Sequence, residues 1–214
     1  MSSIPCDIVL LPEHSLADKG VAASQKLESF GGLFALEDGK FYPHMSLYMF
    51  QLDIDDIAKV EDVLRQIAGK FSVVTSEANK YSLSKGHHEG YIDSEYEASY
   101  ELHALQDAVV AAINPTRAGM LEKDIAKMED ATGVKLENLQ MYGYSSIGEL
   151  FRPHMTLTRL EGHNPEALNA LPEASELSGM FDRLGLFEMG DNGTCVRKLL
   201  ELPLIPYTIE LVNA

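Results

Sequence analysis

The sequence is poor in cysteine and in basic residues, and it has no long hydrophobic run. Its 214 residues include only two cysteines, Cys6 and Cys195, whose separation matches neither a metal-binding nor a redox motif. We therefore expect free thiols in a reducing compartment. No apolar stretch approaches the roughly 20 residues that a membrane span requires, and the first residues lack the basic and apolar regions of a secretory signal. The sequence thus predicts a cytoplasmic protein without a membrane partner.

The shortage of basic residues also limits the class of ligand. The chain contains 17 basic and 33 acidic residues, which gives a formal net charge of −16. This charge has the wrong sign for holding a long phosphate backbone by counterion release, so we expect no long nucleic acid as a partner. A nucleotide or another small phosphoester is compatible with the charge, because one local site can override the overall field. The 45% share of hydrophobic residues predicts a globular core, although tryptophan is absent.

A seven-residue phrase occurs twice, about half a chain apart. Residues 41–47, Phe-Tyr-Pro-His-Met-Ser-Leu, return as residues 151–157, Phe-Arg-Pro-His-Met-Thr-Leu. Five of the seven positions are identical, and a sixth keeps a hydroxyl group. Each copy alternates as a half-buried strand does, and positions i and i+2 of a strand lie on one side, roughly 6.6 to 6.8 Å apart. Each strand is therefore expected to present a histidine and a hydroxyl to the same small group.

The repetition of histidine and hydroxyl favours chemistry over packing. One copy alone would be compatible with a core histidine, but a structural duplication needs only the apolar periodicity at both sites. Moving a phosphoryl group needs a base, an acid and hydrogen-bond donors for the non-bridging oxygens. The two copies supply such groups as His44, Ser46, His154 and Thr156.

These paired His-x-[Ser/Thr]-apolar motifs resemble those of the two-histidine (2H) phosphoesterase superfamily, which includes the bacterial and archaeal 2′-5′ RNA ligases and the cyclic nucleotide phosphodiesterases. The resemblance implies two similar α+β lobes around a central groove. It implies that His44 and His154 act as general base and general acid, in an order that the sequence leaves open, and that Ser46 and Thr156 donate hydrogen bonds to the phosphate. It also implies that neither a metal nor a cofactor is required.

Several neighbouring residues are candidates for the same groove. Arg152 shares the parity of His154 and could hold phosphate, although a solvated edge arginine is an equally good interpretation. Tyr48, Thr158 and Tyr142 are expected to line the groove, with Tyr142 offering a face on which a base could stack; the aromatic residues could instead complete the core. The run His87-His88-Glu89 is not expected to bind a metal, because adjacent ligands diverge and flanking glycines favour a loop.

The apolar periodicity predicts an α+β protein with antiparallel or mixed sheets. Expected strands cover residues 6–11, 33–36, 40–52, 71–75, 80–84, 90–93, 180–189 and 195–202. The second and third would form a hairpin, the next three would complete the first sheet, and Asp191-Asn192-Gly193 would form the turn between the last two. Ser15 and Asp53 are expected to cap one helix each, and further helices are expected to cover 96–114, 121–131, 136–150 and 165–171. We expect one bilobal domain over 1–214, with a first motif half at about 1–95, a helical segment at about 96–150 and a second motif half at about 151–214.

The resulting hypothesis is a metal-independent phosphodiesterase that opens a 2′,3′-cyclic phosphate or a related small phosphodiester, and that we expect to be a monomer. One alternative is an RNA-end-processing enzyme with 2′-5′ RNA ligase character, which would need a local basic rim. Another is a non-catalytic protein that binds a phosphorylated ligand; the presence of two proton-transfer groups speaks against it.

Overall fold

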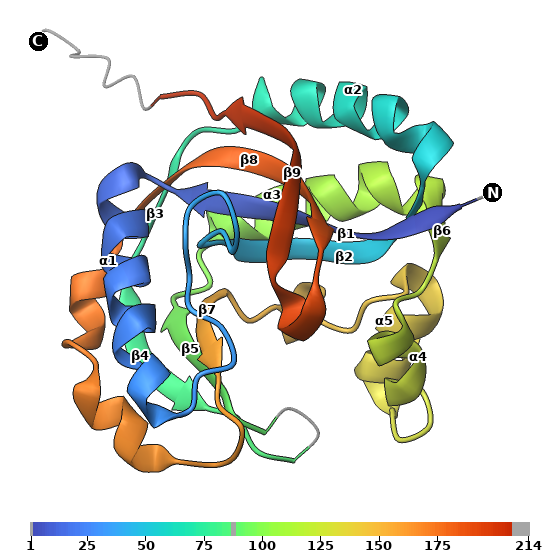
Figure 1. Cartoon of the computed structure of the whole chain (residues 1–214). Helices are drawn as coiled ribbons and strands as arrows, with labels where there is room; N and C mark the ends of the chain where they lie inside the picture. The colour runs from blue at the N-terminus through green and yellow to red at the C-terminus, as the bar shows by residue number, and fades with distance from the viewer. Residues whose placement is uncertain (1, 87–88, 207–214) are drawn as a thin grey trace, which may run out of the picture.

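The computed structural model describes residues 2–86 and 89–206, and it has the α+β class and the two lobes that the sequence predicts (Figure 1). His87 and His88, where no metal was expected, lie outside the described residues. Among the helices of the described ranges, none combines the length and the apolar character that crossing a membrane would require.

The first lobe is built on a six-stranded antiparallel sheet. Its strands are β1 (Ser3–Pro12), β2 (Met45–Asp53), β3 (Val74–Ser76), β6 (Arg117–Gly119), β8 (Gly179–Met189) and β9 (Cys195–Pro203). The order is β3-β8-β1-β2-β6, with β9 paired to β8. The central strand β1 has its last seven residues buried, which explains why residues 8–11 are all apolar and do not alternate with polar residues.

The second lobe holds a three-stranded antiparallel sheet, β4 (Ala78–Leu83), β5 (Tyr91–Tyr96) and β7 (His154–Arg159), in the order β4-β5-β7. This pairing corrects one expectation. The strands near 80–84 and 90–93 do not complete the first sheet but pair with the second motif strand, while β8 and β9 return to the first sheet. The lobes are therefore not the two halves of the sequence, because each sheet takes strands from both.

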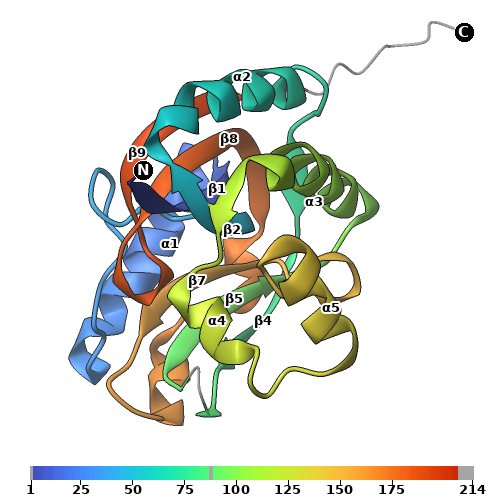
Figure 2. The ribbon, with the colours of Figure 1, turned by 90° about the vertical axis from the view of Figure 1, so that its right-hand side faces the viewer.

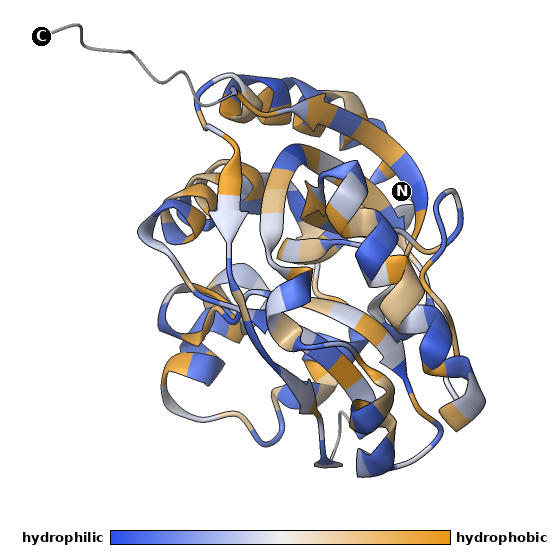
Figure 3. Ribbon diagram, turned by 90° about the vertical axis from the view of Figure 1, so that its left-hand side faces the viewer, coloured by the Kyte–Doolittle hydropathy of each residue, from blue (hydrophilic) through white to orange (hydrophobic). Residues whose placement is uncertain are grey.

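Helices cover these sheets much as their apolar spacing predicts. α2 (Ile57–Ala68) buries Val60 and Leu64 and ends at Gly69; in Figure 3 its hydrophobic and hydrophilic residues alternate along the ribbon. Asp53 accepts a 3.2 Å hydrogen bond from the Asp55 amide, in the turn that leads into α2. α3 (Tyr100–Ile113) packs against α2 and β2.

The first helix and the expected hairpin differ from the sequence prediction. α1 (His14–Lys26) begins without a side-chain cap, because Ser15 donates its hydroxyl to Glu13 instead of accepting from a backbone amide. The hairpin is reduced to a single bridge between Glu37 and Phe41, around a turn in which Gly39 has a φ of 80°. The reason is competition for partners: β2 forms its long ladder with β1.

The helical segment lies beside the cavity that separates the lobes. It contains α3, the short strand β6, α4 (Glu122–Lys127) and α5 (Gly133–Tyr142). In Figure 1, α4 and α5 stand across from α1, with the second sheet between them, and Figure 2 shows the same two helices from the side at the level of β5 and β7. The segment thus forms one wall of the site described next.

Candidate active site

A cavity of about 330 Å³ lies between the two sheets. Both motifs contribute to its lining, as the sequence analysis expected of a shared groove. The motif residues that line it are His44, Ser46, Arg152, His154 and Thr156. The histidine that precedes β2 and the histidine that begins β7 therefore face one space, although they belong to different sheets.

The two histidines make the same backbone contact. Nδ1 of His44 lies 2.7 Å from the carbonyl oxygen of Tyr42, and Nδ1 of His154 lies 2.7 Å from the carbonyl oxygen of Arg152. A carbonyl oxygen only accepts, so Nδ1 carries the proton and donates it. In the neutral ring this leaves the lone pair on Nε2. Both imidazoles are thereby held in the tautomer that can take a proton from a ligand at Nε2.

The hydroxyls of the two motifs each donate a hydrogen bond to an aspartate. Ser46 donates to Oδ2 of Asp7 at 2.6 Å, and Thr156 donates to Oδ1 of Asp93 at 2.8 Å. Both carboxyl groups are buried, so they fix the orientation of the hydroxyl oxygens. Neither aspartate was predicted from the sequence to lie in the site. A usable signal was present, since an aspartate inside a buried strand is rarely found without a polar partner.

A β-bulge in each motif strand corrects the predicted place of Tyr48 and Thr158. The β1–β2 register passes from Val9 opposite Ser46 to Ile8 opposite Tyr48, which leaves Leu47 as the extra residue. Because a one-residue shift exchanges the two faces of a strand, Tyr48 turns into the core, where it is 0% exposed. Met49 takes the position that faces the cavity instead.

The second motif strand repeats this geometry. The β5–β7 register passes from Asp93 opposite Thr156 to Ile92 opposite Thr158, so that Leu157 is the extra residue. Thr158 is 0% exposed and donates a 2.6 Å hydrogen bond to the carbonyl oxygen of Phe34. Thr158, like Tyr48, belongs to the core and not to the groove.

Tyr142 is likewise not among the described residues that line the cavity. Its side chain packs against the core, and its carbonyl oxygen accepts a hydrogen bond from the Tyr48 hydroxyl at 2.7 Å. Tyr144, two positions further on, lines the cavity in its place. Burial raises the pKa of the Tyr144 hydroxyl well above its ordinary value, so Tyr144 can act as a hydrogen-bond donor throughout the physiological pH range.

Arg152 faces the cavity, and its charge is shared with two carboxylates. Its guanidinium lies 2.8 Å from Asp93 and 2.7 Å from Glu95, and its side chain is 45% exposed. Arg152 thus faces the cavity, as expected of a phosphate-binding residue, and is also partly solvated, as expected of an edge arginine. Since Asp93 also holds Thr156, Arg152 and the hydroxyl belong to one network.

Burial shifts the pKa values of two groups beside the first motif. Burial lowers the pKa of the His44 imidazole to about 4, while the hydrogen bond to the Tyr42 carbonyl opposes the change. Burial also raises the pKa of Asp7 to about 7, against the opposing hydrogen bond from Ser46. At neutral pH the His44 ring is therefore uncharged and Asp7 is protonated in part. His154 is more exposed than His44.

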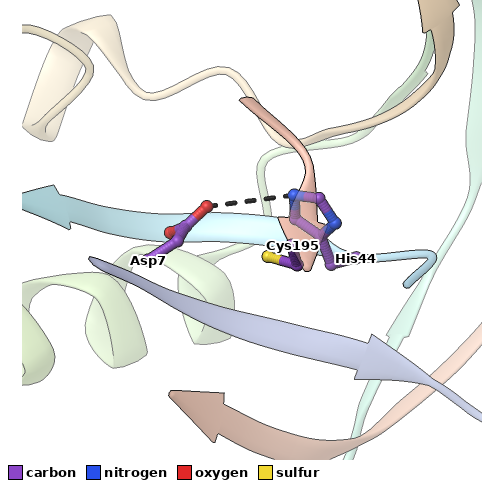
Figure 4. Close-up of side chains that lie close together, drawn as sticks. All are labelled: Asp7, His44 and Cys195. Carbon is purple, nitrogen blue, oxygen red and sulfur yellow. Dashed lines mark ion pairs between the residues drawn. The ribbon is translucent and has the colours of Figure 1, made fainter. Parts of the chain in front are cut away.

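One group of side chains in the described ranges has a spacing that would fit an ion. The potential ligand atoms of Asp7, His44 and Cys195 all lie within 4.8 Å of one another, and all three residues are buried (Figure 4). Figure 4 also marks the 3.9 Å separation between Nε2 of His44 and Oδ2 of Asp7. Burial raises the pKa of the Cys195 thiol well above its ordinary value, which disfavours the thiolate that a metal requires. We therefore assign no metal to these residues.

The fold is similar to that of several solved structures. TT0787 of Thermus thermophilus superposes with a TM-score of 0.60 at 15% identity, covering 96% of this chain and 100% of that one. LigT of E. coli complexed with 3′-AMP gives a TM-score of 0.59 at 11% identity, with 95% and 99% covered. A structure described as a phosphoesterase gives 0.50 at 11% identity, with 95% and 99% covered. The superpositions establish the fold, and at identities this low they show the fold alone; at the level of the fold, the resemblance noted from the motifs is confirmed.

The sequence comparisons add little to the structural ones. Residues 92–187, less than half of the chain, match a family model described as "Protein of unknown function (DUF1045)". A search among curated proteins gave no match.

Proposed function

We propose that this protein is a metal-independent phosphodiesterase of the 2H type, which opens a 2′,3′-cyclic phosphate or a related small phosphodiester. The observation that carries the proposal is the duplicated site. Two histidines with the same Nδ1-to-carbonyl contact, each followed by a hydroxyl bound to a buried aspartate, face one cavity. A protein that only binds phosphate has no need for two proton-transfer groups in the same tautomer.

His44 is the better candidate for the general base in hydrolysis. Its lowered pKa keeps Nε2 free to accept a proton at neutral pH. In the proposed reaction a water molecule attacks phosphorus and gives its proton to His44. The bond from phosphorus to one ribose oxygen breaks, and a protonated His154 donates its proton to that oxygen. The roles exchange when the reaction runs backwards as ligation.

The hydroxyls are proposed to stabilise the charge on the non-bridging oxygens. Ser46 and Thr156 each donate their hydroxyl proton to an aspartate. A hydroxyl therefore has to rotate this proton away from the aspartate before it can donate to phosphate. Asp7 makes this possible for Ser46, because a protonated Asp7 can donate to the Ser46 oxygen while Ser46 donates to the ligand. Burial raises the pKa of Asp7 and so favours its protonated form.

The similar structures and the size of the cavity favour a small substrate. LigT of E. coli has been crystallised with phosphate, 3′-AMP, NADP+ and ATP, all of which are phosphate groups or carry them. A cavity of about 330 Å³ is at the lower end of the range for small-molecule sites. An RNA-end-processing enzyme with 2′-5′ ligase character is the second candidate, since it would use the same groups in the reverse direction.

The first experiment is turnover of a 2′,3′-cyclic nucleotide in excess chelator by the wild type and by His44→Ala and His154→Ala. Each variant is expected to lower kcat by roughly 10² to 10⁴. His163→Ala is the matched control, because His163 is exposed and is not among the residues that line the cavity. Failure of the wild type to open any small phosphodiester, or full activity of either variant, would overturn the proposal.

Combining the two histidine variants provides a second test. If the histidines act as a unit, His44→Ala/His154→Ala should cost far less than the product of the single effects, because the first substitution already removes the concerted proton transfer. Multiplicative losses would indicate that the two residues act independently, for instance in binding alone.

A further inference from the structure

The helical segment contributes three lysines to the cavity. Lys123 and Lys127 lie on α4, and Lys135 lies on α5. All three line the same cavity as His44 and His154. The whole chain has only 17 basic residues against 33 acidic ones, so this grouping departs from the average surface. An acidic protein repels anions at long range, and a local group of lysines is what would let an anion bind.

The cations of the site are not equally engaged by carboxylates. Arg152 is held by Asp93 and Glu95, and Lys127 lies 2.7 Å from Asp124. Within residues 2–86 and 89–206, Lys123 and Lys135 form no ion pair at contact distance. Nζ of Lys123 lies 2.9 Å from the thioether sulfur of Met49, which is a weak acceptor. Lys123 and Lys135 are therefore the lysines of this cavity that no described carboxylate holds at contact distance.

One phosphodiester does not account for these groups. A phosphodiester carries a single negative charge, and the motif histidines and hydroxyls already provide it with a base, an acid and donors. Lys123 and Lys135 come from a part of the chain outside both motifs, as do Tyr144, Ser145 and Ser146, which also line the cavity. An ammonium group binds phosphate as a point charge. The wall formed by α4 and α5 thus offers two ammonium groups to a second anionic group.

We propose that this wall binds a second anionic group of the substrate, a phosphate monoester, through Lys123 and Lys135. The substrate class is then a small sugar phosphate or nucleotide that carries a phosphate monoester in addition to the phosphodiester. The inference rests on the proposed function for the reaction, but it concerns ligand binding and can be measured without catalysis.

Binding is tested by calorimetry with two product-like ligands, 3′-AMP and adenosine 3′,5′-bisphosphate. The bisphosphate is expected to bind at least about tenfold more tightly to the wild type. In Lys123→Gln and Lys135→Gln this preference should shrink towards one. Added salt should also reduce the preference, because the contacts are partly exposed to solvent. Lys59→Gln, at an exposed position of α2 outside the cavity lining, is the control and should keep the preference.

Turnover provides the second measurement, with 2′,3′-cyclic AMP and its 5′-phosphorylated derivative as substrates. We expect kcat/KM to favour the phosphorylated substrate, and each lysine variant to lower that preference through KM. Equal affinity of the wild type for the two ligands, or a preference that both lysine variants retain, would overturn the second anion site. Absence of turnover with an intact binding preference would overturn the catalytic proposal alone.

Discussion

Ser46 and Asp7 form a 2.6 Å hydrogen bond in the interior of the protein. The other carboxyl oxygen of Asp7, Oδ1, has no hydrogen-bond partner among the described residues. A buried carboxylate with only one strong donor is poorly stabilised as an anion, and burial accordingly raises the pKa of Asp7 to about 7. Asp7 therefore orients the Ser46 hydroxyl of the proposed phosphate site, and its titration is expected to make the free energy of unfolding depend on pH.

We expect Asp7→Asn to stabilise the protein at pH 8 and to have little effect near pH 4. For a carboxyl group whose pKa is raised on folding, the favourable contribution is complete below the unfolded value and is lost as pH rises through the folded one. The relevant window thus runs from about 3.8 to about 7. The upper limit of the gain is about 4 kcal/mol, from about 1.4 kcal/mol per pKa unit. Urea unfolding of both proteins at the two pH values measures it, and an equal difference at both would refute the assignment.

The pH profile of kcat/KM should have a low acid limb. The proposed base must be neutral, and the pKa of His44 is lowered to about 4, so activity should persist below the ordinary histidine range and fall only as pH approaches 4. On the alkaline side, activity should fall as the proposed acid loses its proton. Steady-state kinetics from pH 4 upwards provide the test. An acid limb near pH 6.5 would instead assign the base to a solvated histidine.

Excess chelator should leave turnover unchanged. The proposed reaction uses only side chains, and the one group of described residues with ion-like spacing includes His44 itself. An ion bound there would occupy the lone pair that the base needs, so the proposed reaction cannot depend on one. Turnover before and after dialysis against chelator measures the dependence on a metal. Cys195→Ser weakens the group formed by Asp7, His44 and Cys195, and Cys6→Ser is its control. Activity that disappears on dialysis and returns with a metal ion would contradict the mechanism.

Tyr48 and Tyr144 should respond differently to loss of the hydroxyl. Tyr48→Phe removes a hydroxyl whose one proton is shared between Oδ1 of Asn114 and the Tyr142 carbonyl oxygen. We expect this change to lower the free energy of unfolding by about 1 to 3 kcal/mol without a direct effect on KM. Tyr144→Phe changes the cavity wall and should act mainly on ligand affinity. Chemical denaturation and substrate titration of both variants separate the two effects. If Tyr48→Phe changed KM but left the free energy of unfolding unaltered, Tyr48 would instead be assigned to the groove.

The repeated phrase predicted most of what places the histidines together. It predicted the two motif strands, because a strand depends on a pattern within a few residues, and its resemblance to the 2H motifs implied the shared groove. The α+β class was predicted from the apolar periodicity of the other segments. The Asp191-Asn192-Gly193 turn also depends on a pattern within a few residues, and Asn192 and Gly193 do adopt positive φ, at 58° and 74°. The roles of His44, His154, Ser46 and Thr156 in catalysis stay predictions until the variants are measured.

What only the tertiary structure decided is how these strands pair and which face each side chain takes. The bulges at Leu47 and Leu157 leave no mark in the hydrophobic pattern, so unbroken alternation wrongly placed Tyr48 and Thr158 in the groove. Strand sequences do not specify their partners, so the exchange of strands between the sheets was not foreseen. Asp7, Asp93 and the lysines of α4 and α5 reach the site through long-range packing, which depends on burial across the whole chain and not on local spacing.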